Sequence, residues 1–205
     1  TQSIVTALGL EMSDLFVEKK TKPVYEIESV YDYREESNQL LYQSVRRRLT
    51  NPDECPEAKA KTFTQRRPNE SGGWIYDLKG VRRVLYRLPE LLAAHPEATV
   101  FICEGEKDVD RLIELGLIAT TNPMGAGKWR KDFKESLHGR EVVILPDNDK
   151  PGREHAQGVA KHLHGIAASI RILELPKLAE SGDVSDWLDA GGEVKTLRDL
   201  AKNAP

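Results

Sequence analysis

Cysteine is scarce in this sequence, and long apolar runs are absent. Only Cys55 and Cys103 occur among 205 residues, and neither belongs to a C-x-x-C spacing. The pattern excludes a zinc ribbon or a disulfide framework and favours a reducing, cytoplasmic location. No run of about 18 apolar residues occurs, and the first residues lack the charged and apolar regions of a signal peptide. We therefore expect neither a membrane span nor secretion.

A Walker-type phosphate loop is also missing. The segment NPMGAGK, residues 122–128, contains some of the glycines of such a loop. The full pattern, G-x-x-x-x-G-K-[ST], requires glycine where Asn122 stands and a hydroxyl residue where Trp129 stands. A glycine-rich turn that presents Lys128 to a nucleoside triphosphate or a nucleic-acid phosphate is one interpretation, and an ordinary loop is the other. The histidines further along lack an obvious third metal ligand, and we interpret them as exposed helix residues: His155, His162 and His164.

Charge is distributed unevenly along a chain whose formal net charge is −3. Between Arg46 and Arg87 there are eleven Lys or Arg and five Asp or Glu, whereas the chain from Pro96 onward holds 15 basic and 19 acidic residues. A basic segment before an acidic one suits a protein that holds a polyanion and processes it. A solvated, arginine-rich sheet face is the alternative. The candidate nucleic-acid contacts are Arg66, Arg67, Arg82 and Arg83.

Two regions of the sequence differ in periodicity. Residues 1–22 are polar and poorly periodic, and we expect a tail or linker there. Residues 23–97 contain short β-like runs separated by turn formers, for example 24–33 and 72–80, and predict a small antiparallel, partly open sheet. The pattern changes near residues 95–98, where we expect a domain boundary.

Residues 98–205 alternate between strand-like and helix-like segments. A strand over 98–104 leads into a helix over 107–116, and a strand over 141–147 leads into a helix over 151–165. Another helix is expected between these units, in the segment WRKDFKESLHG. Repeated βα units predict a parallel sheet covered by helices on both faces, which is the α/β class.

Acidic clusters stand at the ends of three segments in this region. Glu104 and Asp108 belong to VFICEGEKD, Asp147 and Asp149 to VVILPDNDKPG, and Asp183 to GDVSDWL. Open α/β sheets bind their ligands beyond the carboxyl ends of the strands. Carboxylates gathered there repel one another unless a hard divalent cation holds them. The sequence therefore predicts a site that uses Mg²⁺ or Mn²⁺ and acts on phosphates.

Some of these acids also have purely structural explanations. Asp108 suits the first turn of a helix, where the helix dipole favours an acid. Asp183 suits a helix N-cap, with Asp186 at N3 as in a capping box. We interpret Glu106 and Asp110 as exposed residues at the start of a helix.

The motifs VFICEGEKDVDRL and VVILPDNDKPGREHA resemble the Toprim domain, which DnaG-type primases share with topoisomerases and some nucleases. The resemblance covers about residues 98–190, and GDVSDWL is similar to a third acidic motif of primases. Upstream, about residues 30–95 are similar to primases and primase–helicases of phages and mobile elements in their order TFTQRRP, then GWIYDLKGVRRVLYRLPEL. The implied fold is a Rossmann-like parallel sheet flanked by helices, preceded by a small antiparallel β-rich subdomain.

This resemblance also implies roles for individual residues. Glu104 would be the general acid or base, and Asp147 and Asp149 would hold the metal. Asp108 and Asp183 would be further contributors to the metal site. Lys128 and Lys150 are the candidate phosphate contacts from this half of the chain.

The implied activity is that of a DNA primase, a nucleotidyltransferase that joins ribonucleoside triphosphates into RNA primers on a single-stranded DNA template. Such primases carry a zinc-binding module before this region and often a helicase after it. Two cysteines cannot build the first and no Walker motif supports the second, so we expect a fragment or a chain that relies on such partners. A Toprim-type metal-dependent nuclease and a non-catalytic DNA-binding or replisome-docking module are the alternatives.

Overall fold

The computed structural model describes Ala7 and residues 21–205. Most of the expected tail or linker over residues 1–22 lies outside these described residues. The chain divides into two compact units, which we treat separately. The described part of the first unit is Ala7 and residues 21–29 with 46–63, and the second unit is residues 30–45 with 64–205.

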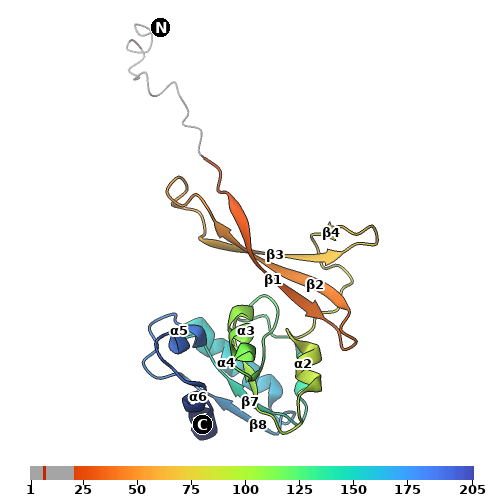
Figure 1. The fold of residues 1–205 in the computed structure, drawn as a ribbon, viewed down its shortest axis with the longest axis vertical. Coiled ribbons are helices and arrows are strands. Elements are labelled where there is room, and N and C mark those ends of the chain that lie inside the picture. The colour runs from red at the N-terminus through yellow and green to blue at the C-terminus, as the bar shows by residue number, and fades with distance from the viewer. Residues whose placement is uncertain (1–6, 8–20) are drawn as a thin grey trace. The chain divides into compact units, whose positions relative to one another are not determined.

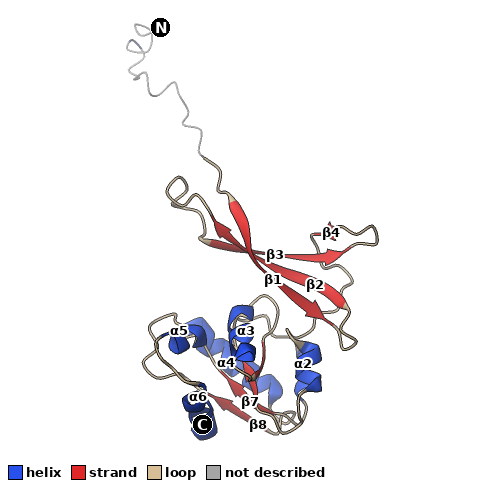
Figure 2. Ribbon diagram, in the orientation of Figure 1, coloured by secondary structure: helices blue, strands red, loops and turns tan. Residues whose placement is uncertain are grey.

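An antiparallel sheet comes first along the chain and is followed by a parallel sheet with its helices (Figures 1 and 2). This arrangement confirms the predicted α/β fold class. The elements are β1 (Tyr25–Arg34), β2 (Leu40–Leu49), β3 (Lys61–Pro68), β4 (Trp74–Ile75), α2 (Leu88–Ala93), β5 (Val100–Ile102), α3 (Glu106–Glu114), β6 (Ile118–Thr120), the 3₁₀ helix η2 (Lys131–Leu137), β7 (Glu141–Ile144), α4 (Lys150–Leu163), β8 (Ser169–Ile172), α5 (Val184–Asp189) and α6 (Val194–Asn203).

The antiparallel sheet has the strand order β1-β2-β3-β4. A tight turn joins β1 to β2: the amide of Asn38 donates to the carbonyl of Glu35 at 2.8 Å, and Asn38 has a φ of 70°, which asparagine tolerates. β4 has only two residues, fewer than the run predicted over 72–80. Gly72 and Gly80 both have positive φ, so the chain turns at both ends of this run and leaves little of it extended.

The parallel sheet has the strand order β6-β5-β7-β8. β5 lies between β6 and β7, and all of its pairings are parallel, with Ile102 opposite both Thr120 and Ile144. The chain passes from β5 to β6 on one side of it, and later returns to form β7 and β8 on the other side. The strand order therefore reverses between β5 and β7, which is where open α/β sheets form a binding crevice.

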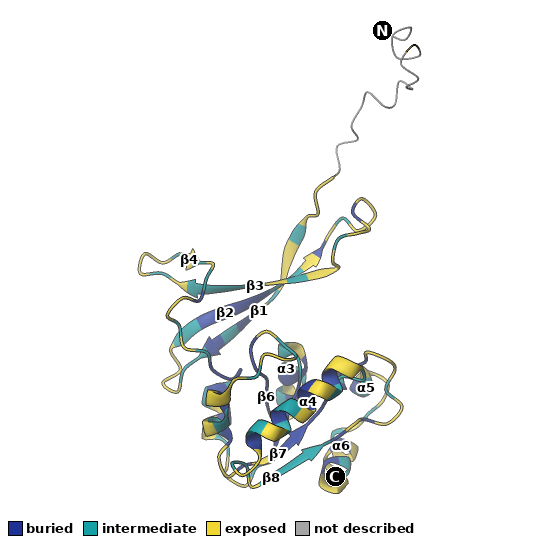
Figure 3. Ribbon diagram, turned by 180° about the vertical axis from the view of Figure 1, so that it is seen from behind, coloured by how far each residue is buried: buried dark blue, intermediate teal, exposed yellow. Residues whose placement is uncertain are grey.

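Helices pack on this sheet through their apolar sides. α4 crosses one face, and its buried stripe includes Ala156, Val159 and Leu163, as the banding of the helix in Figure 3 shows. α6 lies at the other face and buries Leu197 and Ala201. The helix expected in WRKDFKESLHG is instead the short 3₁₀ helix η2, whose ends are closed by i→i+3 backbone bonds.

A buried arginine holds the carboxyl end of α2. The guanidinium of Arg140 donates to the carbonyls of Leu91 at 3.0 Å, Ala94 at 3.2 Å and His95 at 2.6 Å. The last carbonyls of a helix have no partner within the helix, so Arg140 supplies hydrogen bonds that α2 cannot make for itself.

Both cysteines are free and buried. Cys55, which is 8% exposed, belongs to the first unit, and Cys103, which is 3% exposed, belongs to the second. Among the described residues, no helix combines the length and the apolar character needed to cross a membrane.

Candidate catalytic site

Glu104 and Asp147 follow the two strands between which the strand order reverses. β5 ends at Ile102 and β7 ends at Ile144, and these two residues are opposite each other in register. The amide of Leu145 donates to the carbonyl of Ile102 at 2.8 Å, so the segments that follow β5 and β7 leave the sheet side by side. Glu104 and Asp147 therefore both lie beyond the carboxyl edge of the sheet, next to the point where the strand order reverses.

The acids of all three clusters lie within electrostatic reach of Asp147. Burial and, after it, nearby negative charges together raise the pKa of the Asp147 carboxyl to about 8; these charges belong to Glu104, Asp108, Asp183 and Asp149. The structure thus gathers the five carboxylates that the sequence singled out. Their assigned chemical roles stay predictions.

Glu104 is held at its backbone but has a free carboxylate oxygen. The Thr121 hydroxyl donates to the Glu104 carbonyl at 3.0 Å. Burial, followed by the charges of Asp149 and Asp108, raises the pKa of the Glu104 carboxyl, and a hydrogen bond from the Ala126 amide lowers it. Its Oε2 atom is buried and has no hydrogen-bond partner in the described part of the chain. The fold of the described residues therefore leaves this oxygen without a hydrogen bond.

Asp149 has a structural role that the sequence reasoning did not anticipate. It is the N-cap of α4, and its Oδ1 accepts from the amide of Gly152 at 2.7 Å. A Cβ on Gly152 would lie 2.6 Å from the carbonyl oxygen of Asp147. The first turn of α4 therefore fixes both Asp147 and Asp149.

Asn148, between those aspartates, ties their loop to the segment before α5. Its Nδ2 donates to the carbonyls of Leu178 at 2.8 Å and Ala179 at 3.0 Å, and its Oδ1 accepts from Arg153 at 3.1 Å. Sequence reasoning missed this residue. Its position between two candidate ligands was the only available signal.

For Asp108 and Asp183 the structural explanations are observed. Asp183 and Asp186 form a capping box at the start of α5, and Lys107 Nζ lies 3.0 Å from Asp183 Oδ2. Asp108 is 5% exposed and accepts from the Ser185 hydroxyl at 2.5 Å. Burial raises the pKa of Asp108 to about 6. Burial alone would also raise the pKa of Asp183, but the Asp186 amide and Lys107 reverse the shift, so its pKa is lowered.

The expectation that Glu106 and Asp110 are exposed was wrong. Both are half-buried because tyrosines cover this part of α3. The hydroxyl of Tyr33 donates to Glu106 Oε1 at 2.9 Å, and the hydroxyl of Tyr86 donates to Asp110 Oδ1 at 3.0 Å. Arg87 adds an ion pair to Asp110 at 2.6 Å.

The expectation of exposed histidines was wrong for His155, which is only 8% exposed. Its ring lies under the loop 122–128, and its Nδ1 accepts from the amide of Gly127 at 3.1 Å. His162 is half-buried, and its Nδ1 lies 2.8 Å from the carbonyl oxygen of Gly158. His164 is exposed, as expected.

The two lysines proposed as phosphate contacts are both exposed. Lys128 stands at the end of the loop 122–128, and Lys150 begins α4 directly after Asp149. Lys150 Nζ lies 3.7 Å from Glu154 one helical turn away, a weak surface pair that leaves the amine free to move.

Arg66 and Arg67 are neighbouring residues of β3. Arg66 is placed over the ring of Trp74, 4.1 Å from its centroid, and donates to Gln43 Oε1 at 2.8 Å. Arg67 forms an ion pair with Asp77 at 3.3 Å. Arg66 and Trp74 together present a flat cationic and aromatic surface of the kind on which bases stack.

Arg82 and Arg83 lie in the connector that follows β4. Arg82 forms an exposed ion pair with Glu36. Arg83 donates to the carbonyls of Leu78 and Val81 and lies 5.8 Å from the ring centroid of Tyr42. The structure therefore uses Arg83 to hold its own backbone.

The donor set fits a divalent cation held by few protein ligands. Among the described residues, no group of three or more His, Cys, Asp or Glu side chains is arranged to enclose a metal ion. Mg²⁺ usually takes only one or two carboxylates and keeps water and substrate phosphate as its other ligands. The unpartnered Oε2 of Glu104 and the mutual repulsion around Asp147 are the features that a cation would relieve.

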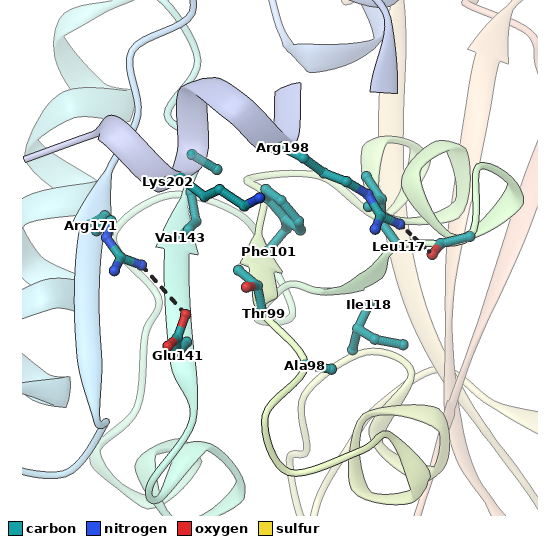
Figure 4. Close-up of a pocket in the computed structure, with 12 residues that line it drawn as sticks. Ala98, Thr99, Phe101, Leu117, Ile118, Glu141, Val143, Arg171, Arg198 and Lys202 are labelled. Carbon is teal, nitrogen blue, oxygen red and sulfur yellow. Dashed lines mark hydrogen bonds and ion pairs between the residues drawn. The ribbon is translucent and has the colours of Figure 1, made fainter. Parts of the chain in front are cut away.

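A separate cavity of about 320 Å³ lies at the opposite edge of the parallel sheet (Figure 4). Phe101 and Val143 contribute apolar lining, and Arg171, Arg198 and Lys202 are its basic lining residues. Arg171 is paired with Glu141 at 3.6 Å, and Arg198 donates to the carbonyl of Gly116 at 3.4 Å. The candidate acids do not line this cavity, so it is separate from the candidate site at the carboxyl edge.

No family model matches the chain. The gene 57 protein of Mycobacterium phage D29 is 39% identical over 97 residues, which cover 47% of this chain and 59% of that protein. The chain thus spans less than two thirds of this relative.

Solved structures show the likeness at the level of the fold. The primase fragment of the bacteriophage T7 primase-helicase protein matches with a TM-score of 0.53 and 19% identity over 79% of this chain and 57% of that one. The E. coli primase catalytic core matches with a TM-score of 0.58 and 16% identity, over 85% of this chain and 51% of that one. A DnaG primase catalytic domain bound to single-stranded DNA matches with a TM-score of 0.59 and 16% identity, over 85% of this chain and 52% of that one. The chain therefore has the fold of the catalytic cores of DnaG-type primases.

Proposed function

We propose that this chain is the catalytic Toprim region of a cytoplasmic DNA primase, which uses Mg²⁺ or Mn²⁺ to synthesise RNA primers on single-stranded DNA. The observation that carries the proposal is the gathering of Glu104, Asp147 and the neighbouring acids at the point where the strand order reverses. A buried, mutually repelling set of carboxylates costs stability, which a purely structural role would not require.

Each residue has a part in the proposed chemistry. Glu104 would accept the proton of the attacking ribose hydroxyl: burial raises the pKa of its carboxyl, which strengthens it as a base, and its Oε2 has no hydrogen-bond partner among the described residues. Asp147 and Asp149 would hold the cation, with Asp108 and Asp183 setting the charge around it. When bound, the cation would neutralise charge on the reacting phosphates.

The remaining parts of the proposal concern partners. Arg66 with Trp74 would stack template bases, while Lys128 and Lys150 would contact phosphates of the ribonucleoside triphosphates. One similar structure is a primase domain bound to single-stranded DNA, and another is a fragment of a primase-helicase. Because the chain spans only part of these proteins, we propose that a zinc-binding module or a replicative helicase assists it.

A primer-synthesis assay tests the proposal. The chain is incubated with single-stranded DNA, labelled ribonucleotides and Mg²⁺ or Mn²⁺, and a second assay supplies a short RNA annealed to the template, so that extension is measured without initiation. We expect nucleotide incorporation that Asp147→Asn abolishes. Glu114→Gln, which changes an exposed carboxylate at the end of α3 in the same way, should retain activity.

The same assay separates the alternatives. Metal-dependent cleavage of labelled DNA without incorporation would assign the site to a Toprim-type nuclease. DNA binding without either reaction, under both initiation and extension conditions, would assign the chain to a binding or replisome-docking module. Either result would overturn the primase proposal.

A further inference from the structure

His155 is a buried histidine that the proposed chemistry does not use. It lies on α4, is 8% exposed, and accepts a hydrogen bond from the amide of Gly127 at its Nδ1, at 3.1 Å. An accepting Nδ1 places the ring proton on Nε2, which is buried and without a partner among the described residues. A buried donor left unpaired costs free energy, so the ring orientation is set by the hydrogen bond at Nδ1 and not by one at Nε2.

The loop that His155 holds has an unusual backbone. Met124, Gly125 and Gly127 all have positive φ, between 70° and 72°. Asn122, buried at the start of the loop, donates from Nδ2 to the carbonyl of Gly125 at 2.8 Å. The loop is thus a tight turn whose shape depends on contacts at both of its ends.

Two amides of this loop are directed at protein side chains. The amide of Gly127 donates to His155, and the preceding amide, that of Ala126, donates to the carboxylate of Glu104. A phosphate-binding loop would leave such amides free. Two adjacent amides therefore connect α4 to the carboxylate that follows β5.

We propose that His155 is a positioning residue for Glu104, acting through the loop 122–128. By holding Gly127, His155 places the Ala126 amide on one carboxylate oxygen of Glu104. The other oxygen, Oε2, keeps no hydrogen-bond partner among the described residues. This inference rests on the proposed function, because it holds that the orientation of the Glu104 side chain matters for nucleotide transfer.

Two substitutions at the same position separate the hydrogen bond from the packing. His155→Asn keeps an acceptor, because asparagine Oδ1 stands where histidine Nδ1 does, whereas His155→Leu keeps the bulk and removes the acceptor. In the extension assay we expect kcat of His155→Leu to fall about tenfold or more, since small misplacements of a catalytic group are costly, with the KM for ribonucleotides within about twofold. His155→Asn should recover most of kcat. His164→Leu, at the exposed end of α4, is the matched control and should behave as the wild type.

Amide hydrogen exchange of peptides covering residues 122–128 gives a readout that does not depend on activity. We expect faster exchange there in His155→Leu than in the wild type and in His155→Asn, with unchanged exchange in β5 and β7. Equal kcat in the wild type and His155→Leu overturns the inference, and so does a loss of kcat that is equal in both variants. If the wild type itself is inactive, the proposed function falls and the role in catalysis falls with it. Exchange then still shows whether His155 holds the loop.

Discussion

Gly152 lies so close to Asp147 that a Cβ on the glycine would stand 2.6 Å from the carbonyl oxygen of Asp147 and 3.0 Å from its amide nitrogen. Both neighbours are backbone atoms, so they cannot rotate away as a side chain could. The absence of a side chain at Gly152 is what allows the strand-end loop and α4 to approach this closely.

Replacing Gly152 therefore tests the geometry of the aspartate loop. Alanine is normally better than glycine inside a helix by about 0.5–1 kcal/mol. Here we expect Gly152→Ala to destabilise the chain by roughly 1–3 kcal/mol, the usual cost of overpacking, and to abolish nucleotide incorporation. Thermal unfolding and the extension assay measure the two effects.

Gly158 on the same helix is the matched control. Within the described residues, nothing lies within 4 Å of a Cβ built there. Gly158→Ala should raise Tm by a few degrees and leave activity unchanged. Equal effects of the two substitutions would contradict the close approach at Gly152.

Asp147→Asn should stabilise the metal-free protein in a pH-dependent way. Burial and neighbouring acids raise the pKa of Asp147 from 3.8 to about 8. An acid with a raised pKa favours folding below pH 4, and this contribution is lost as the pH rises through 8. As the pH rises from 4 to 8, the free energy of unfolding of the variant should therefore increase relative to that of the wild type. The increase should be on the order of 1–2 kcal/mol after allowance for solvent screening.

Thermal unfolding in EDTA at several pH values measures this gain, which corresponds to roughly 2–8 °C in Tm for a chain of this size. Glu114→Gln should give a Tm difference that does not change with pH. A constant offset for Asp147→Asn across the same range would argue against a charged, desolvated Asp147.

Divalent cations should stabilise the wild type through the same carboxylates. At a free Mg²⁺ concentration ten times Kd, mass action adds about 1.4 kcal/mol to the free energy of unfolding. We expect the Tm to rise with Mg²⁺ at pH 7 in the wild type and in Glu114→Gln, and to rise less than half as far in Asp147→Asn. An identical shift in all three proteins would mean that the cation binds elsewhere.

Arg66 and Arg83 should differ in their effect on DNA binding. No carboxylate of the described residues pairs with Arg66, whereas Arg83 donates to the carbonyls of Leu78 and Val81. Arg66→Ala should weaken binding to single-stranded DNA and make the log–log dependence on salt shallower by about 0.7. Arg83→Ala should leave that slope unchanged, as measured by fluorescence anisotropy of a labelled oligonucleotide. A slope that changes only in Arg83→Ala would reverse the assignment.

The predictable part of the fold was the part encoded locally. The apolar runs before Glu104 and Asp147 locate the two strands, and parallel pairing then places the acids at the same edge of the sheet, although pairing stops at Ile102 and Ile144, before the predicted ends at 104 and 147. The capping box at Asp183 was also readable, because its two residues are three apart. The short extent of β4 and the 3₁₀ form of η2 were not, since local patterns do not show where pairing stops.

The unpredicted contacts join residues that are far apart in the chain. The bond between Gly127 and His155 spans 28 positions, and the bond between Tyr33 and Glu106 spans 73. A histidine or glutamate on a helix looks the same in sequence whether it is solvated or covered. Only the packing of another segment decides between these outcomes, which is why His155, Glu106 and Asp110 were placed wrongly.

The two buried cysteines give each compact unit its own chemical reporter. Cys55 is in the first unit and Cys103 in the second, where burial raises the pKa of the Cys103 thiol well above its ordinary value. A thiol reacts with an alkylating reagent only when it is exposed and ionised. Pulsed alkylation read by mass spectrometry would therefore time the opening of each unit separately, without an introduced label.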